Sequence, residues 1–157
     1  MPYQIEIKKI NDVNRIYSLL KRLFVPQRLE KIGDVFSYAG KLAEKAVFLV
    51  GIYKEMDAGF LAYYYNSAEK EMYVTALAVD KNLGLLSSRV MVDLLRYGYN
   101  DKRDYHVVRI EVDRDNVSAL KLYRRVGFSC VEEKENSLIM TMDKDTIRAT
   151  LPWVEDM

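Results

Sequence analysis

The sequence contains few of the residues that build disulfides, metal sites or histidine-dependent active sites. Cys130 is the only cysteine, so an internal disulfide is excluded. His106 is the only histidine, and it opens a strand-like segment at an end that we expect to be exposed. One histidine and one cysteine leave too little for a metal-ligand cluster, and no Ser-His-Asp or Cys-His arrangement can be built around His106. We therefore expect no metal ion and no catalytic histidine.

An excess of one charge and long apolar runs are also lacking. The 157 residues include 24 Lys and Arg against 23 Asp and Glu, a balance that disfavours binding to nucleic acid or to a membrane surface. No apolar run approaches the roughly 20 residues that span a bilayer. The polar, alternating segment MPYQIEIKKIND at the N-terminus has the pattern of neither a signal peptide nor a transit sequence. We expect a cytoplasmic protein with no nucleic-acid or membrane partner.

The composition is typical of a globular protein, since 50% of the residues are hydrophobic and 30% are charged. The length suits one domain over residues 1–157. Alternating or mostly apolar segments predict strands, and apolar stripes at three- and four-residue spacing predict helices. Strands are expected at 3–9, 46–53, 58–65, 71–79, 106–112, 128–135 and 136–144. Helices are expected after a cap at Asn11 (stripe Val13, Ile16, Leu19, Leu20 and Leu23), after Pro26 (Leu29, Ile32, Phe36, Ala39 and Leu42 or Ala43 inward), at 86–99 and after Asn116.

Short connections set the expected topology. The turns KEMD and NSAEK are too short for crossovers, so the strands at 46–79 should form an antiparallel meander. The strand–helix–strand segment 71–112 should be a right-handed crossover, which makes its two strands parallel. The predicted fold class is α/β, with a mixed, mostly antiparallel sheet of about seven strands flanked by about four helices. The expected order is β-α-α-β-β-β-α-β-α-β-β.

The segment NVSALKLYRRVGF contains a helix with an unusual inner residue. Asn116 suits the N-cap, because its side-chain carbonyl can accept a backbone N–H of the first turn. Ala119, Leu122, Tyr123 and Val126 form one apolar stripe, and Gly127 suits the left-handed position that ends many helices. Any apolar residue at 123 would complete this stripe, so the phenol of Tyr123 needs another explanation.

The longer stretch RIEVDRDNVSALKLYRRVGF resembles the strand–loop–helix signature of the GNAT family of N-acetyltransferases, in which Asn, Ala, Leu-Tyr and Gly-Phe occur at these spacings. The element order also resembles that family over nearly the full chain. The resemblance implies a GNAT-like fold that binds acetyl-CoA between two diverging strands. It further implies that Asn116 contacts the pantetheine arm and that Tyr123 is the general acid for the departing thiolate. Without this role, Asn116 is a helix cap and Tyr123 a core aromatic.

The family's phosphate loop usually reads Arg/Gln-x-x-Gly-x-Gly/Ala, whereas this chain has DKNLGLLSSRVM with one glycine. In one register Gly84 takes the first glycine position and Lys81 the Arg/Gln position. In the other, which we favour, LGLLSS matches the end of the motif and Leu86 and Ser88 replace glycines. An ordinary strand-to-helix turn is the alternative. The cofactor-binding residues that the resemblance implies are Leu77 and Val79 through their main chain, Gly84, Leu85, Leu86, Ser87, Ser88, Arg89 and Asn116.

An acceptor amine must lose a proton, and the family often uses a carboxylate on one of the two central strands. Glu111 is the only carboxylate well inside its strand, and it is the first candidate for the base. The alternative for Glu111 is a salt bridge with a neighbour such as Arg109 or an arginine of a helix. Tyr73 is a candidate substrate contact or water holder. The alternation of AYYYN places Tyr63 and Tyr65 on one face, where they could contact an acceptor, although strand propensity also explains them.

The resemblance implies an enzyme, an acetyl-CoA-dependent N-acetyltransferase in which a primary amine attacks the thioester directly. The acceptor is a small-molecule or peptide amine of unknown identity. A ping-pong route through Cys130 is disfavoured, since no neighbouring residue in the sequence marks that thiol as activated. Two alternatives stay open: a binding module on the same fold without turnover, and an enzyme that uses another acyl-CoA. A homodimer is also left open.

Overall fold

The computed structural model describes residues 3–101 and 104–146. Their contacts group into two compact units. The first unit comprises the described residues up to Tyr64 together with Ala76–Leu95. The second unit comprises Tyr65–Thr75 and the described residues from Arg96 onward. The prediction of a single domain over residues 1–157 stays a prediction.

Seven strands form a mixed sheet, as predicted. In the first unit their order is β1-β2-β3-β4, and in the second it is β4-β5-β7-β6, so β4 contributes to both units. The β1–β2, β2–β3, β5–β7 and β6–β7 pairs are antiparallel, and β4–β5 is the parallel pair that the crossover predicts. The strands are β1 (Glu6–Lys9), β2 (Val47–Tyr53), β3 (Met56–Asn66), β4 (Glu71–Val79), β5 (Val107–Asp113), β6 (Ser129–Glu133) and β7 (Ser137–Asp143).

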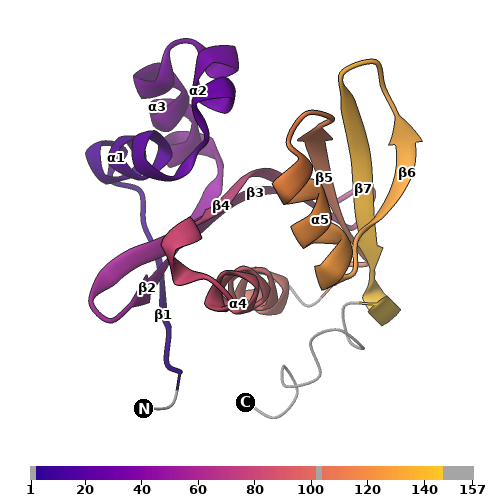
Figure 1. The fold of residues 1–157 in the computed structure, drawn as a ribbon. Coiled ribbons are helices and arrows are strands. Elements are labelled where there is room, and N and C mark those ends of the chain that lie inside the picture. The colour runs from indigo at the N-terminus through magenta and orange to yellow at the C-terminus, as the bar shows by residue number, and fades with distance from the viewer. Residues whose placement is uncertain (1–2, 102–103, 147–157) are drawn as a thin grey trace. The chain divides into compact units, whose positions relative to one another are not determined.

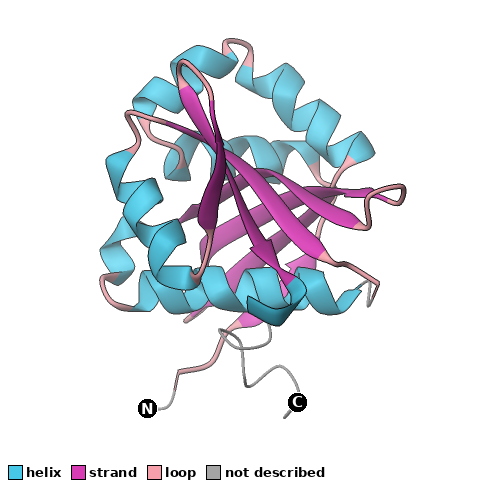
Figure 2. Cartoon of the chain, turned by 90° about the vertical axis from the view of Figure 1, so that its right-hand side faces the viewer, coloured by secondary structure: helices cyan, strands magenta, loops and turns pink. Residues whose placement is uncertain are grey.

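Figure 2 shows the helices in cyan and the strands in magenta. The chain order is labelled in Figure 1. The helices are α1 (Val13–Leu23), α2 (Pro26–Ile32), α3 (Val35–Lys45), the 3₁₀ turn η1 (Lys81–Leu83), α4 (Leu86–Asp101) and α5 (Val117–Val126). Among the helices of the described residues, none is long and apolar enough to cross a membrane.

The first unit has a core between α1, α3 and one face of β2 and β3. Phe48 and Phe60 stack there with ring centroids 5.3 Å apart. Because side chains alternate along a strand, one set of positions faces these helices and the other faces away. The buried residues of this core are Ile16, Leu19, Leu20, Ala39, Leu42, Phe48, Val50, Phe60, Ala62 and Ala76.

The first turns of α4 pack on the other face of the same strands. Gly51 and Gly59 are opposite each other in the β2–β3 register. A Cβ on Gly51 would lie 3.6 Å from Leu94, and one on Gly59 would lie 2.9 Å from the carbonyl oxygen of Ala78 and 3.3 Å from Val90. The glycine at 59 therefore lets the backbone and α4 approach closely. In the first unit, helices therefore cover both faces of β2 and β3, in agreement with the predicted sheet flanked by helices.

The N-terminal helices differ from the prediction in three details. Asp12, not Asn11, caps α1, accepting the backbone N–H groups of Asn14 and Arg15. The single helix expected after Pro26 is two helices, because Gly33 adopts a φ of 78° and Asp34 caps a new helix through the N–H of Ser37. This break turns Phe36 outward, so its predicted inward position is wrong.

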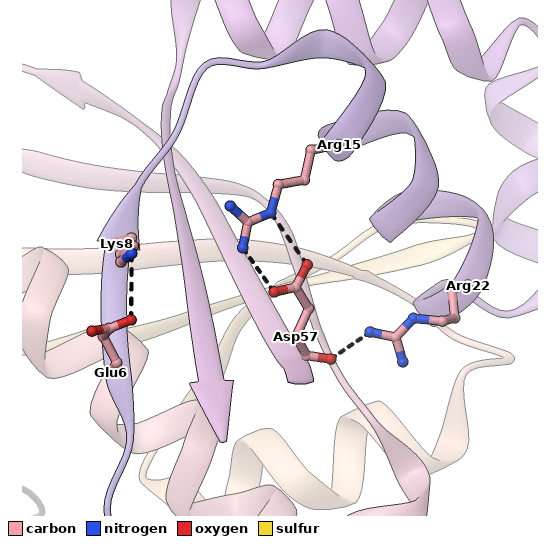
Figure 3. Close-up of polar contacts among 5 residues, drawn as sticks. All are labelled: Glu6, Lys8, Arg15, Arg22 and Asp57. Carbon is pink, nitrogen blue, oxygen red and sulfur yellow. Dashed lines mark hydrogen bonds and ion pairs between the residues drawn. The ribbon is translucent and has the colours of Figure 1, made fainter. Parts of the chain in front are cut away.

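Ionic contacts join α1 to β3 in the first unit. Arg15 donates to both carboxylate oxygens of Asp57, at 2.8 and 3.3 Å, and this contact raises the pKa of the Arg15 guanidinium. Arg22, two turns further along α1, donates to the main-chain carbonyl of Asp57 (Figure 3). The Lys8–Glu6 pair on β1, also in Figure 3, is exposed.

In the second unit, β5 is paired along its whole length with β7, from Val107–Asp143 to Asp113–Ser137. Its parallel pairing with β4 covers Glu71–Val74 opposite Val107–Ile110. The hairpin of β6 and β7 closes the sheet as predicted, with a register shift between Cys130 and Glu132. The buried apolar residues of these elements include Met72, Val74, Val108, Ile110, Val112, Leu138, Met140 and Met142.

Candidate functional site

Helix α5, in the second unit, carries the two residues that most need explanation. The Asn116 side-chain oxygen accepts the backbone N–H of Ala119 at 3.3 Å, so Asn116 is the N-cap that the sequence predicts. This contact does not use the amide nitrogen of the side chain. Gly127, at a φ of 125°, ends the helix, and its N–H donates to the carbonyls of Tyr123 and Arg124.

Tyr123 lies on the inner side of α5 and is only 6% exposed. Its ring packs against Phe128, with centroids 5.8 Å apart, and its main-chain carbonyl accepts the N–H of Phe128. The buried stripe is Leu120, Tyr123 and Val126, whereas Ala119 and Leu122 are half-buried. The ring of Tyr123 thus packs, within the second unit, against a residue close to it in sequence.

Glu111 lies on the polar face of β5, with contacts to the β6–β7 hairpin. The Ser137 hydroxyl donates to its Oε2 at 2.6 Å, and Lys134 Nζ lies 3.5 Å from its Oε1. A salt bridge was the alternative interpretation of this carboxylate; the partner is Lys134 and not Arg109. Both oxygens are therefore oriented, and the half-exposed carboxylate keeps access to solvent.

Arg109 and Tyr73 are opposite each other in the β4–β5 register. Arg109 Nε donates to Glu71 Oε2 at 2.8 Å, which raises the pKa of the Arg109 guanidinium. Glu71 is buried although it opens its strand. Tyr73 is half-buried beside this pair. The sequence analysis did not predict this ion pair. It could have been inferred from the opposite charges on two strands that were expected to be parallel neighbours.

The strand-to-helix loop of the first unit begins where β4 ends. Leu77 is buried and Val79 half-buried, as expected for residues that would act through their main chain. After η1, Gly84 adopts a φ of 57°, and a Cβ there would meet no atom within 4 Å. Glycine is therefore needed at 84 for its backbone conformation and not for space.

The residues after Gly84 open α4. The carbonyl of Gly84 accepts both the N–H of Ser87, at 3.1 Å, and its hydroxyl, at 2.8 Å. The Ser87 hydroxyl is thus turned back onto the loop. Leu85 is 96% exposed, while Leu86 and Ser88 are half-buried. The N–H groups in the first turn of a helix and the helix dipole favour binding of an anion. In a glycine-rich loop these N–H groups are open to the ligand, whereas here the large side chain of Leu85 stands in the loop.

Lys81 and Arg89 are the two cationic residues of the segment predicted to be the phosphate loop. The guanidinium of Arg89 lies over the ring of Tyr3, with its carbon 4.5 Å from the ring centroid. The Tyr3 hydroxyl donates to Asp93 at 2.8 Å, and burial together with this contact raises the pKa of Tyr3. Arg89 is thus held by a neighbour in the first unit, whereas Lys81 on η1 is exposed.

The tyrosines of β3 fall in different units. Tyr63 is fully buried in the first unit, and Tyr65 in the second unit donates to Asp104 and packs edge-on against Tyr105. The structure thus brings Tyr65, Tyr73, Glu111, Asn116 and Tyr123 into the second unit. Leu77, Val79, Tyr63 and Gly84 to Arg89 lie in the first.

The mixed sheet, the parallel β4–β5 pair and the capped α5 define a known class: the chain has the fold of the GNAT N-acetyltransferases. It is similar to the PaiA N-acetyltransferase of Thermoplasma acidophilum, solved in complex with coenzyme A, with a TM-score of 0.72 and 17% identity over 89% of this chain and 99% of that one. It is also similar to the ribosomal-protein-S18-alanine N-acetyltransferase of Escherichia coli, with a TM-score of 0.66 and 17% identity over 89% and 94%.

A third similar structure is the N-acetyltransferase PseH of Campylobacter jejuni, with a TM-score of 0.65 and 17% identity over 89% of this chain and 98% of that one. PseH has also been solved with acetyl coenzyme A. No model of a protein family matches the sequence, and no curated protein matches it significantly. At these identities the likeness establishes the fold.

Proposed function

We propose that this protein is an acetyl-CoA-dependent N-acetyltransferase. The observation that carries the proposal is the pairing, on one short helix of a GNAT fold, of a capping Asn116 with a buried phenol at Tyr123. Solved structures of this fold include one with coenzyme A and one with acetyl coenzyme A.

The reaction is a direct transfer. The nitrogen of a neutral primary amine attacks the thioester carbonyl carbon and a C–N bond forms. The nitrogen then loses one proton to water, and the C–S bond breaks to release coenzyme A thiolate. Tyr123 donates its phenolic proton to that thiolate and regains one from solvent. Glu111, oriented by Ser137 and Lys134, accepts the proton of the acceptor ammonium, directly or through water.

Binding of the cofactor is divided among main-chain and side-chain groups. The amide nitrogen of Asn116 donates to the pantetheine arm, and the main chain at Leu77 and Val79 contacts the acetyl and pantetheine groups. The diphosphate lies at the segment from Gly84 to Arg89, where N–H groups of the α4 N-terminus bind it. Tyr73 and Tyr65 contact the acceptor, which is a small-molecule or peptide amine. The protein acts in the cytoplasm.

One observation favours a second function, a module that binds partners without turnover. The exposed Leu85, together with Leu86, occupies the loop where small residues would leave the N–H groups open. Such a module would keep the fold and lose tight binding of coenzyme A.

Thermal unfolding with acetyl-CoA, coenzyme A or buffer separates the two functions. Ligand at about a hundred times its dissociation constant should add about 2.7 kcal/mol of stability. A shift followed by thiol release with a panel of amines supports the enzyme, and propionyl- and succinyl-CoA in the same assay test the acyl group. No shift with either cofactor would contradict the enzyme and favour the module.

A further inference from the structure

Arg22 joins two segments of the first unit that are distant in sequence. It lies in the last turn of α1, where a cation is favoured by the helix dipole. One terminal nitrogen, Nη2, donates to the main-chain carbonyl of Asp57 near the start of β3 (Figure 3). The other, Nη1, lies 3.3 Å from Oδ2 of Asp80, directly after β4. The guanidinium thus bridges β3 and the loop that leads to α4.

Asp80 uses each of its polar groups to hold that loop. Its Oδ1 accepts the N–H of Asn82 at 2.9 Å and caps η1, while Oδ2 faces Arg22. Its own N–H donates to the carbonyl of Ala58 at 2.8 Å. The carboxylate can serve the cap and the ion pair together because the two contacts use different oxygens. The orientation of η1, and with it the approach to Gly84, therefore depends on the Asp80 carboxylate.

The same carboxylate has an electrostatic cost for an anionic ligand. Asp80 lies four residues before Gly84, where the proposed function has the cofactor diphosphate bind, and like charges repel. Asp80 is 22% exposed and Arg22 43% exposed, so their pairing is only partly screened by water. Arg22 therefore offsets a negative charge beside the loop as well as holding its geometry.

We propose that Arg22 is a positioning residue for cofactor binding, which fixes the loop 80–84 through Asp80 and neutralises that carboxylate near the diphosphate. This inference rests on the proposed function. It assigns a role to a contact between α1 and the phosphate loop, and Arg22 itself does not touch the reacting atoms.

Arg15 provides a matched control. It lies on the same helix and makes an ion pair of similar exposure, but its bonds go to the Asp57 carboxylate and not to the loop. A purely structural contribution of α1 arginines should therefore appear in Arg15→Gln and Arg22→Gln alike. An effect through the loop should appear in Arg22→Gln.

The test compares wild type with Arg15→Gln, Arg22→Gln, Asp80→Asn and the double variant Arg22→Gln/Asp80→Asn. For each protein, calorimetry gives the dissociation constant for acetyl-CoA. Thermal unfolding gives the stability, and amide hydrogen exchange is followed at residues 81–84. Arg22→Gln should raise the dissociation constant about fivefold, the size of a part-exposed charge contact, and speed exchange in the loop. Arg15→Gln should lower thermal stability while leaving both quantities near wild type. The double variant should regain affinity relative to Arg22→Gln, because the uncompensated charge is gone and the amide oxygen of Asn can still cap η1.

Each outcome separates this inference from the proposed function. Equal affinity in wild type and Arg22→Gln, with loop exchange unchanged, would overturn the role of Arg22 and leave the proposed function standing. Failure of the wild-type protein to bind acetyl-CoA would overturn the proposed function and this role with it.

Discussion

Arg109 Nε donates to Glu71 Oε2 at 2.8 Å, joining the two parallel strands of the second unit where their pairing begins. Glu71 is buried, and Arg109 is partly exposed. A buried carboxylate without a partner is costly, so the pair is needed once Glu71 is in this position. Tyr73, opposite Arg109, adds a phenol to the same cluster.

Arg109→Met should therefore destabilise the protein by about 2 kcal/mol, less than the full cost of a fully buried pair because Arg109 reaches solvent. The physical reason is the buried charge left on Glu71. Urea unfolding at neutral pH measures the change. Lys8→Met, which removes the exposed Lys8–Glu6 pair, is the control and should cost well under about 1 kcal/mol. Equal losses in the two variants would show that the Glu71–Arg109 pair is not the reason.

Tyr123→Phe should lower turnover by roughly a hundredfold, since general acid catalysis typically contributes that much or more. The dissociation constant for acetyl-CoA should stay within about twofold, because the ring and its packing on Phe128 are retained. Single-turnover thiol release and calorimetry measure the two quantities. Tyr99→Phe, at 8% exposure in the same unit, is the matched control and should behave as wild type. Unchanged turnover in Tyr123→Phe would remove the general-acid assignment while leaving the fold intact.

Much of this fold is predictable from local patterns. The bounds of β4, Glu71–Val79, follow from an apolar run between two polar turns, and the start and stop of α5 follow from Asn116 and Gly127. The break at Gly33 was missed because Ile32 and Phe36 continue a helical spacing across it. There the positive φ of Gly33 and the cap at Asp34 outweigh the apolar period.

The polar contacts of the candidate site are less predictable, because they join residues distant in sequence. Arg22 and Asp80 are 58 positions apart, and Glu71 and Arg109 are 38 apart. The spacing of the two residues in the sequence predicts neither contact. Both contacts result from the strand register and from the placement of the helices. The roles of Tyr123 and Glu111 come from the family resemblance, since burial and a strand position alone suit a core aromatic and an ion pair equally well.

Glu111→Gln should reduce turnover by roughly a hundredfold at neutral pH, because the amide cannot accept the proton of the acceptor ammonium. The hydrogen bond from Ser137 can persist, so thermal stability should change little. The deficit should shrink as pH rises and more of the acceptor amine becomes neutral by itself. Glu133→Gln, an exposed carboxylate on β6, is the control. A variant at 111 with the turnover and pH profile of wild type would place the base elsewhere.

Asn116 can be tested so that its two roles separate. Asn116→Asp keeps an oxygen for the N–H of Ala119 and adds a negative charge that a helix N-terminus favours, so stability should equal or exceed that of wild type. It removes the amide N–H donors, so the acetyl-CoA dissociation constant should rise about tenfold, as for a lost hydrogen bond that leaves an acceptor unpaired. Asn116→Ala should lose both affinity and about 1 kcal/mol of stability. If Asn116→Asp binds acetyl-CoA as wild type does, the asparagine is a cap alone, and the pantetheine arm must be held by main-chain groups.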